Sequence, residues 1–220
     1  MLGPNCKSPA GRGPPPSPPC PTWCAAPGHV PAKRFEGLAH TEGTMRAPLS
    51  PSLPSAPPDA ALGVGARAPS PLLVDPLSGE PRPLLVPGRP TLVTFLRGTW
   101  CGDCRAFLER VGPLHAEVAR RGVSLVGVVC QGRHWVASWL AVNRQPFPLL
   151  VDEERTAARA YGVYKLLGLD GVNIARPASF LVDASGRITW SYVGRDKGDR
   201  PSDALLLERI AQLGEAARAP

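Results

Sequence analysis

The chain has 220 residues, of which 43% are hydrophobic, and a formal net charge of +7. Its length and apolar content allow one good hydrophobic core. The arginines are scattered along the sequence rather than gathered into a stripe, which argues against a nucleic-acid partner. No apolar stretch reaches the roughly 18 residues of a membrane-spanning helix, and none follows Met1 as a secretory signal would. The expected location is therefore the cytoplasm, without membrane attachment.

Proline divides the chain into two parts. Fifteen of its 28 prolines lie within the first sixty residues. Such a stretch cannot sustain the backbone hydrogen bonds of helices or sheets. The sequence therefore predicts a disordered Pro-rich tail over residues 1–60 and one compact domain over residues 61–215.

The predicted domain begins with strand-like segments. Residues 72–74 and 84–86 flank a turn at Ser78-Gly79 and are typical of a short hairpin. Residues 91–96 form an apolar run that predicts the first central strand. The helix expected after residue 104 has an apolar face at spacings of four, three and four, which consists of Phe107, Val111, Leu114 and Val118.

The rest of the domain continues the alternation. Gly112-Pro113 is expected to interrupt and kink the first helix, and Ser202 to cap the last one. Between them the sequence predicts strands at 123–130, 147–151, 178–182 and 187–193, and helices at 134–143 and 155–161. This order is typical of an α/β domain with a partly parallel sheet covered on both faces.

A Cys-x-x-Cys motif, Cys101 and Cys104, lies between the strand at 91–96 and the following helix. A thiol at a helix start is stabilised as the nucleophilic thiolate by the partial positive charge of free backbone N–H groups. The first cysteine of such motifs has a pKa between about 3.5 and 7.5, against about 8.5 for free cysteine. We expect Cys101 to attack a disulfide and Cys104 to resolve the mixed disulfide that forms.

The order of elements, with Trp100 before the motif and Pro177 before a later strand, resembles the thioredoxin-like superfamily. Within it, the chain is most similar to the alkyl hydroperoxide reductase and thiol-specific antioxidant family of peroxiredoxin-like redoxins. The resemblance implies a thioredoxin-like fold, in which helices flank a central mixed sheet with an N-terminal β-hairpin extension. It spans residues 62–215 and is carried by segments 62–69, 95–104, 148–152, 158–163 and 176–183.

The same resemblance implies an enzyme, a thiol-disulfide oxidoreductase with antioxidant activity. Trp100 would shield the thiols and offer a substrate surface, and Pro177 would face them through a cis peptide bond. The partners would be a disulfide-containing protein or small molecule and an external thiol electron donor. No metal and no organic cofactor is expected.

The motif departs from thioredoxins in its acidic residues. Thioredoxins carry a buried acid on the strand before the motif, where this chain has Thr94 and Phe95. Asp103 and Asp152 are the candidates to replace that acid as a proton shuttle. The charge of Asp103 is also expected to disfavour the Cys101 thiolate and to make the dithiol a stronger reductant.

Two alternatives stay open. In the first, the protein is a thiol peroxidase, and Cys101 attacks a peroxide. Thr99 lies two residues before Cys101, where peroxiredoxins have a spacing of three. Arg97 or Arg176 would then polarise the peroxide, although an arginine that flanks a strand is ordinarily a solvated cap.

In the second alternative, the domain is a non-catalytic zinc or interaction module. Cys130 and His134 have a spacing that suits zinc and would complete a site with the two motif cysteines. Cys130 is also a candidate for an extra resolving thiol, but a buried and inert cysteine is the simpler expectation.

Overall fold

The computed structural model describes residues 60–168 and 171–216. The predicted Pro-rich tail lies outside these residues except for Ala60, and the domain boundaries stay a prediction. No helix in the described part is both long enough and apolar enough to cross a membrane. The elements, in chain order, are β1 (Leu72–Val74), β2 (Pro81–Pro83), β3 (Thr91–Leu96), α1 (Gly102–Arg120), β4 (Ser124–Val129), α2 (Arg133–Val142), β5 (Leu149–Val151), α3 (Thr156–Ala160), β6 (Tyr164–Gly168), β7 (Gly171–Ala175), β8 (Ala178–Val182), β9 (Ile188–Val193) and α4 (Asp203–Ala216).

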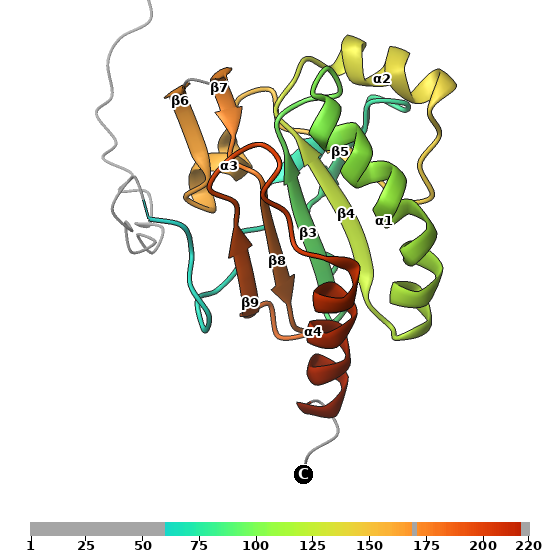
Figure 1. Ribbon diagram of the computed structural model, residues 1–220, viewed down its shortest axis with the longest axis vertical. Helices are drawn as coiled ribbons and strands as arrows, with labels where there is room; N and C mark the ends of the chain where they lie inside the picture. Colours follow the sequence, from blue (N-terminus) through green and yellow to red (C-terminus); the bar gives the residue numbers. More distant parts are fainter. Residues whose placement is uncertain (1–59, 169–170, 217–220) are drawn as a thin grey trace, which may run out of the picture. The chain divides into compact units, whose positions relative to one another are not determined.

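Within the described residues, a seven-stranded mixed sheet has the order β2-β1-β5-β4-β3-β8-β9 (Figure 1). β3, β4 and β5 run parallel, while β8 and β1 pair antiparallel with β3 and β5. All six residues of β3 are buried, because the strand lies between two neighbours and is covered on both faces. The central mixed sheet with flanking helices is the α/β arrangement that the sequence predicted.

The side chains of β3 alternate between two apolar cores. Leu92 and Leu96 join the core beneath α1, α2 and α4, which also holds both motif cysteines. Val93 and Phe95 join the second core with α3, where the ring of Phe95 lies 5.1 Å from that of Tyr161. Figure 1 shows α1 and α4 crossing in front of the sheet. The motif therefore lies on the α1 and α4 face.

The N-terminal hairpin is present, but its second strand differs from the prediction. β1 pairs with residues 81–83 rather than 84–86. The Asp75 N–H donates to the Glu80 carbonyl at 2.9 Å and closes a tighter turn than expected. Prolines are tolerated in β2 because this strand lies at the edge of the sheet.

Helix α1 runs without a break through Pro113 to Arg120, so the predicted interruption at Gly112-Pro113 was wrong, while the kink expected there stays a prediction. Proline removes one backbone hydrogen bond, whereas the buried side chains of Phe107 and Val111 before it and Val118 after it hold both halves against the core. The β6–β7 hairpin between α3 and β8 was not predicted at all.

Helix α4 begins as the sequence predicted. Ser202 precedes it, and its Oγ accepts a hydrogen bond from the Leu205 N–H at 3.2 Å. Leu206, Ile210 and Leu213 point into the core beside α1. This packing brings the segment between β9 and α4 close to the start of α1.

Candidate redox site

The chain turns sharply between β3 and α1. Cys101 is the N-cap residue of α1, with φ of −81° and ψ of 118°, and its carbonyl accepts the Arg105 N–H at 3.1 Å. A Cβ atom at Gly98 would lie 2.2 Å from Nε1 of Trp100, so only glycine allows this indole to fold back. Trp100 remains 53% exposed beside the motif, and its role as a substrate surface stays a prediction.

The side chain of Gln131, which follows β4, holds the turn between β3 and α1. Its side-chain oxygen accepts hydrogen bonds from the Thr99 N–H at 2.7 Å and from the Thr99 hydroxyl at 3.0 Å. Sequence reasoning missed Gln131, which lies after β4 and carries no motif. Since Thr99 is held by Gln131, its hydroxyl does not donate toward Cys101.

The two motif cysteines are free thiols that lie together in the core. Cys101 is 4% exposed and Cys104 is fully buried. Burial raises the pKa of the Cys104 thiol, the nearby charge of Arg200 opposes that rise, and the hydrogen-bonded Cys101 thiol adds to it. The structure therefore brings together the pair that the sequence singled out.

Arg97 contacts the first of these thiols. Its side chain is only 2% exposed, and Nη1 donates toward Sγ of Cys101 at 3.7 Å. The guanidinium carbon also lies 5.1 Å from the centre of the Trp100 ring. The expectation that an arginine at this strand end is a solvated cap was wrong, because the turn folds Trp100 and Cys101 back over it.

The two candidate acids lie in different surroundings. Asp103 is exposed at the start of α1, where Lys197 approaches its carboxylate at 3.8 Å. Asp152 is buried on the other core, where it accepts the N–H groups of Ala157 and Ala158 at 3.1 and 2.8 Å. Asp152 thus holds the start of α3 and does not serve the motif.

Pro177 lies at the same end of the sheet as the motif, since its neighbour Ala178 pairs with Phe95. The predicted cis peptide bond was wrong, because no described residue has one. The Pro177 carbonyl accepts the Gly194 N–H at 2.7 Å and extends the β8–β9 ladder by one bond. An extended trans backbone provides that pairing.

Cys130 lies away from the motif. It belongs to the second core, and its Sγ is 3.8 Å from Oδ2 of Asp152. Burial, with the adjacent Asp152 carboxylate, raises the pKa of the Cys130 thiol to about 12. This is the inert cysteine that the sequence favoured over an extra resolving thiol.

The zinc alternative gains no support from the described residues. Among them, no three His, Cys, Asp or Glu side chains come together in a way that could hold a metal ion. His134 packs edge-on against the ring of Trp135 at 5.8 Å, while Cys130 faces Asp152. The spacing of these two residues therefore does not produce a shared site with the motif.

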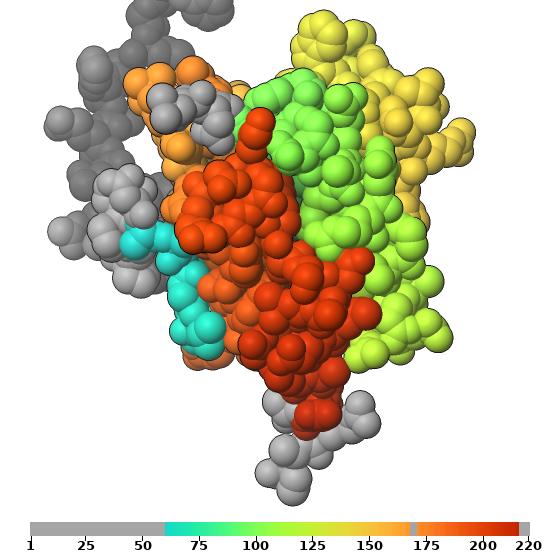
Figure 2. All heavy atoms as spheres, viewed as in Figure 1, coloured from blue at the N-terminus to red at the C-terminus, as the bar shows by residue number. Residues whose placement is uncertain are grey.

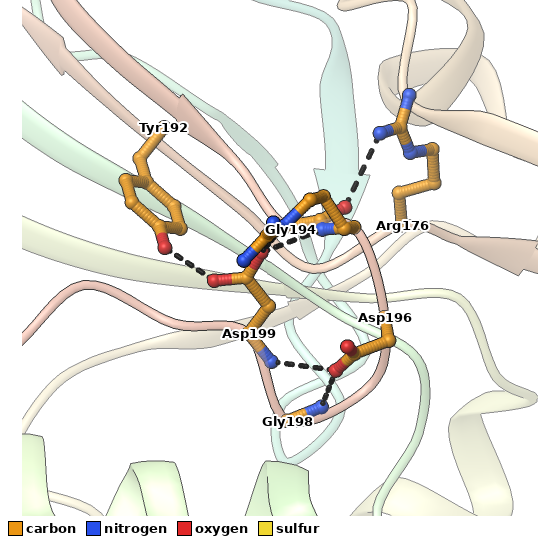
Figure 3. A network of polar contacts seen from close by, with 7 residues as sticks. Arg176, Tyr192, Gly194, Asp196, Gly198 and Asp199 are labelled. Carbon is orange, nitrogen blue, oxygen red and sulfur yellow. Dashed lines mark hydrogen bonds and ion pairs between the residues drawn. The ribbon is translucent and has the colours of Figure 1, made fainter.

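The loop between β9 and α4 is held by the carboxylate of Asp199 (Figure 3). Tyr192 donates its hydroxyl proton to that carboxylate, and Arg195 donates from its backbone N–H at 2.9 Å and from Nε at 3.1 Å. These hydrogen bonds, that of Tyr192 foremost, lower the pKa of Asp199 to about 2. The loop therefore closes on itself around a charged carboxylate.

A second set of contacts ties the same loop to the sheet (Figure 3). The N–H groups of Gly198 and Asp199 donate to Oδ1 of Asp196 at 2.9 and 3.0 Å. Arg176 donates from Nη2 to the Gly194 carbonyl at 3.2 Å. Of the two arginines considered for a peroxide site, Arg97 contacts Cys101 and Arg176 holds this loop.

The loop ends at Arg200, which reaches the second thiol. Nη2 of Arg200 lies 3.5 Å from Sγ of Cys104, and Nη1 donates to the Phe95 carbonyl at 2.8 Å. The guanidinium carbon lies 4.7 Å from the centre of the Phe107 ring. Figure 2 shows the segment after β9, in orange-red, packed against the green surface of α1. No motif in the sequence pointed to Arg200.

Residues 83–191 match the model of the AhpC/TSA family. No curated relative matches the chain. Among solved structures, it is similar to a peroxiredoxin-like protein from Aquifex aeolicus, with 17% identity over 70% of this chain and 89% of that one and a TM-score of 0.63. It is also similar to Mycobacterium tuberculosis AhpC, with 21% identity over 73% of this chain and 97% of that one and a TM-score of 0.60.

A third similar structure is a DsbE-type thiol:disulfide interchange protein from Chlorobium tepidum. Its identity is 26% over 70% of this chain and 99% of that one, with a TM-score of 0.55. All three share the mixed sheet and flanking helices described above. Residues 83–191 of this chain thus match the AhpC/TSA family model, and the chain has the thioredoxin fold of the peroxiredoxin structures to which it is similar.

Proposed function

We propose that this protein catalyses thiol-disulfide exchange, with Cys101 as the attacking thiol and Cys104 as the resolving thiol. The Cys101 thiolate attacks a disulfide RS–SR′, forms a mixed disulfide with RS and releases R′S⁻. The Cys104 thiolate then attacks Sγ of Cys101, releases RS⁻ and leaves the Cys101–Cys104 disulfide. Two electrons pass from the dithiol to the substrate, and an external thiol donor returns them.

One observation carries this proposal: two free thiols lie together in the core, each in contact with a guanidinium group. A thiolate is the reactive form of cysteine, and an adjacent positive charge stabilises it. Contacts with a cation at both positions suit a reaction in which each sulfur ionises in turn. The likeness to a thiol:disulfide interchange protein is consistent with this chemistry.

The substrate is a disulfide-containing protein or small molecule. Trp100 is half exposed and Pro177 is at the same end of the sheet, and we assign both to the surface that a substrate contacts. A cytoplasmic location remains the prediction from the sequence.

Trapping of the mixed disulfide tests the exchange mechanism. A Cys104→Ser variant, mixed with glutathione disulfide, is expected to accumulate a covalent glutathione adduct on Cys101 in peptide mass spectra, whereas the wild type passes on to an internal disulfide. Cys130→Ser is the matched control, because it removes a buried thiol outside the motif and should form no lasting adduct. Absence of any Cys101 adduct would exclude the mechanism.

A second function is supported by the contact between Arg97 and Cys101 and by the family itself. In it, the Cys101 thiolate attacks a peroxide ROOH, becomes a sulfenic acid and releases RO⁻, which takes a proton from solvent to give ROH. Cys104 then condenses with the sulfenic acid to a disulfide and releases water. Initial rates with hydrogen peroxide and with insulin disulfides, measured on one preparation, separate the two functions, and exchange predicts the faster rate with insulin.

A further inference from the structure

Arg200 carries a charge for which the described residues provide no carboxylate partner. Its Nε is buried and has no hydrogen-bond partner. Its other contacts are the neutral Phe95 carbonyl, the face of the Phe107 ring and Sγ of Cys104. Arg200 as a whole is half-buried. A guanidinium stays protonated in a protein, and a charge that is partly withdrawn from water is costly unless an opposite charge lies beside it.

The nearby acids are engaged elsewhere. Asp199 binds Tyr192 and Arg195, and Asp103 faces Lys197. The group that can supply an anion to Arg200 is therefore the thiol that it already touches.

We propose that Arg200 is a positioning residue that supplies the counter-charge for the Cys104 thiolate, and so makes the second thiol of the motif competent to resolve the mixed disulfide. The inference rests on the proposed exchange function and deepens it. Burial by itself would keep Cys104 protonated, and a protonated thiol does not attack. Arg200, whose Nη2 lies 3.5 Å from this sulfur, opposes that effect.

The role of Arg200 falls on the second step of the reaction. When Cys101 is joined to the substrate, the Cys104 thiol loses its proton to solvent and its thiolate lies against Nη2 of Arg200. The thiolate attacks Sγ of Cys101, the substrate sulfur leaves with the electron pair of the broken bond, and the internal disulfide forms. Arg200 makes and breaks no covalent bond.

A consequence for the redox equilibrium follows. In the reduced protein the Cys104 sulfur can ionise and balance the guanidinium, whereas in the disulfide form no anion can form there and the half-buried charge of Arg200 stays without one. Arg200 thus stabilises the reduced form over the oxidised one and raises the reduction potential of the couple. Its removal should make the dithiol a stronger reductant.

The chain offers a matched control in Arg110. This side chain also lies over the Phe107 ring, at 5.2 Å, and ties α1 to the Pro201 carbonyl and to Asp203 at the start of α4. None of these contacts involves a sulfur atom. Arg110→Gln therefore also removes a guanidinium from the Phe107 ring and a contact between α1 and the start of α4. It leaves the charge beside Cys104 in place.

The experiment mixes the reduced full-length protein with glutathione disulfide, quenches with acid at successive times and quantifies the mixed and internal disulfides by mass spectrometry across a pH series. Arg200→Gln is expected to slow the resolving step about tenfold at neutral pH and to move its pH profile upward by about one unit. The equilibrium with glutathione should shift about tenfold, which corresponds to about 30 mV toward stronger reduction. The first step should change little.

One further variant makes the outcome decisive. Arg200→Lys keeps the charge and should retain the wild-type pH profile, even if it lowers stability, and it decides the matter should the Gln variant not fold. The proposal would be overturned if the pH profile of Arg200→Lys moved up by a unit. It would also be overturned if a folded Arg200→Gln variant had the same pH profile as the wild type and Arg110→Gln.

A last measurement separates this inference from the proposed function. If the wild type forms no mixed disulfide, the exchange function fails. The Cys104 titration can still be followed by ultraviolet thiolate absorbance, as the difference between Cys101→Ser and the Cys101→Ser, Cys104→Ser double variant. Addition of Arg200→Gln to both proteins is expected to raise the pKa of Cys104, and an unchanged titration would refute the role of Arg200.

Discussion

Cys104 and Cys130 are two buried thiols on opposite faces of one sheet, 0% and 3% exposed. Burial raises the pKa of both. They differ in the charge beside the sulfur: Cys104 faces the guanidinium of Arg200, and Cys130 faces the carboxylate of Asp152. The comparison teaches that burial alone does not decide whether a thiol reacts, because the sign of the neighbouring charge either opposes the cost of ionisation or adds to it.

The largest expected effect tests whether reactivity is confined to one face of the sheet. Cys101→Ser should lower the rate of insulin disulfide reduction by at least roughly a thousandfold, because the nucleophile is lost. Cys130→Ser should stay within about twofold of the wild type. Comparable losses in the two variants would contradict the assignment of the site.

Alkaline titration sharpens the comparison at Cys130. Its pKa in the folded protein, about 12, lies above the ordinary 9.0, so the stability that it contributes is fully present below pH 9 and is lost as the pH rises toward 12. The loss amounts to at most about 4 kcal/mol. Urea unfolding at several pH values should show a shallower alkaline decline for Cys130→Ala than for the wild type.

Tyr161 serves as the internal reference in that experiment. Burial also raises the pKa of its phenol, so Tyr161 contributes to the alkaline decline in both proteins. Only the difference between the two curves belongs to Cys130, and parallel curves would show that Cys130 does not resist ionisation.

The carboxylate beside Cys130 is expected to be structural. Asp152→Ala removes the acceptor of two buried N–H groups at the start of α3 and should lower the free energy of unfolding by about 2–3 kcal/mol. Asp103→Ala, at an exposed carboxylate facing Lys197, should change it by less than about 0.5 kcal/mol. Equal losses in urea titrations would contradict this division between the two acids.

The smallest expected effect concerns the charge between the motif cysteines. Asp103→Asn removes an anion near Cys101 and should raise the reduction potential, but by less than about 30 mV, because Lys197 already offsets that charge and both side chains are exposed. Equilibration with glutathione measures the shift. A shift toward stronger reduction would contradict the role predicted for Asp103.

The sequence predicted the parts of the fold whose signals are local. The apolar run of β3 was predicted correctly, and so were Phe107, Val111 and Val118 on the buried face of α1, because each pattern reports the burial of its own element. Leu114 was expected on the same face but is only partly buried. The cap of Ser202 is local as well, since it acts on a residue three positions later. The β6–β7 hairpin was not predicted from the sequence because its strands are half exposed. In addition, Asn173 has a φ of 54°, which breaks the alternation of buried and exposed side chains along β7.

The charges of the site could not be read in this way. Arg200 lies 96 residues from Cys104 in the sequence, and the packing of α4 on α1 is what joins them. Arg97 was expected in solvent because charged residues seldom lie buried, but the turn at Gly98 folds Trp100 over it. The sequence thus predicted both thiols, gave Arg97 only as a candidate within the peroxidase alternative, and did not indicate Arg200.

The place of Arg200 in the chain also determines how much of the chain makes a working unit. The segment that matches the AhpC/TSA model ends at residue 191, whereas Arg200 and α4 follow it. A fragment cut at that boundary would keep both cysteines and lose the charge that faces the second one, together with the helix that covers α1. Expression of this domain for enzymology should therefore extend through α4, and the borders of a family match should not be taken as the borders of its chemistry.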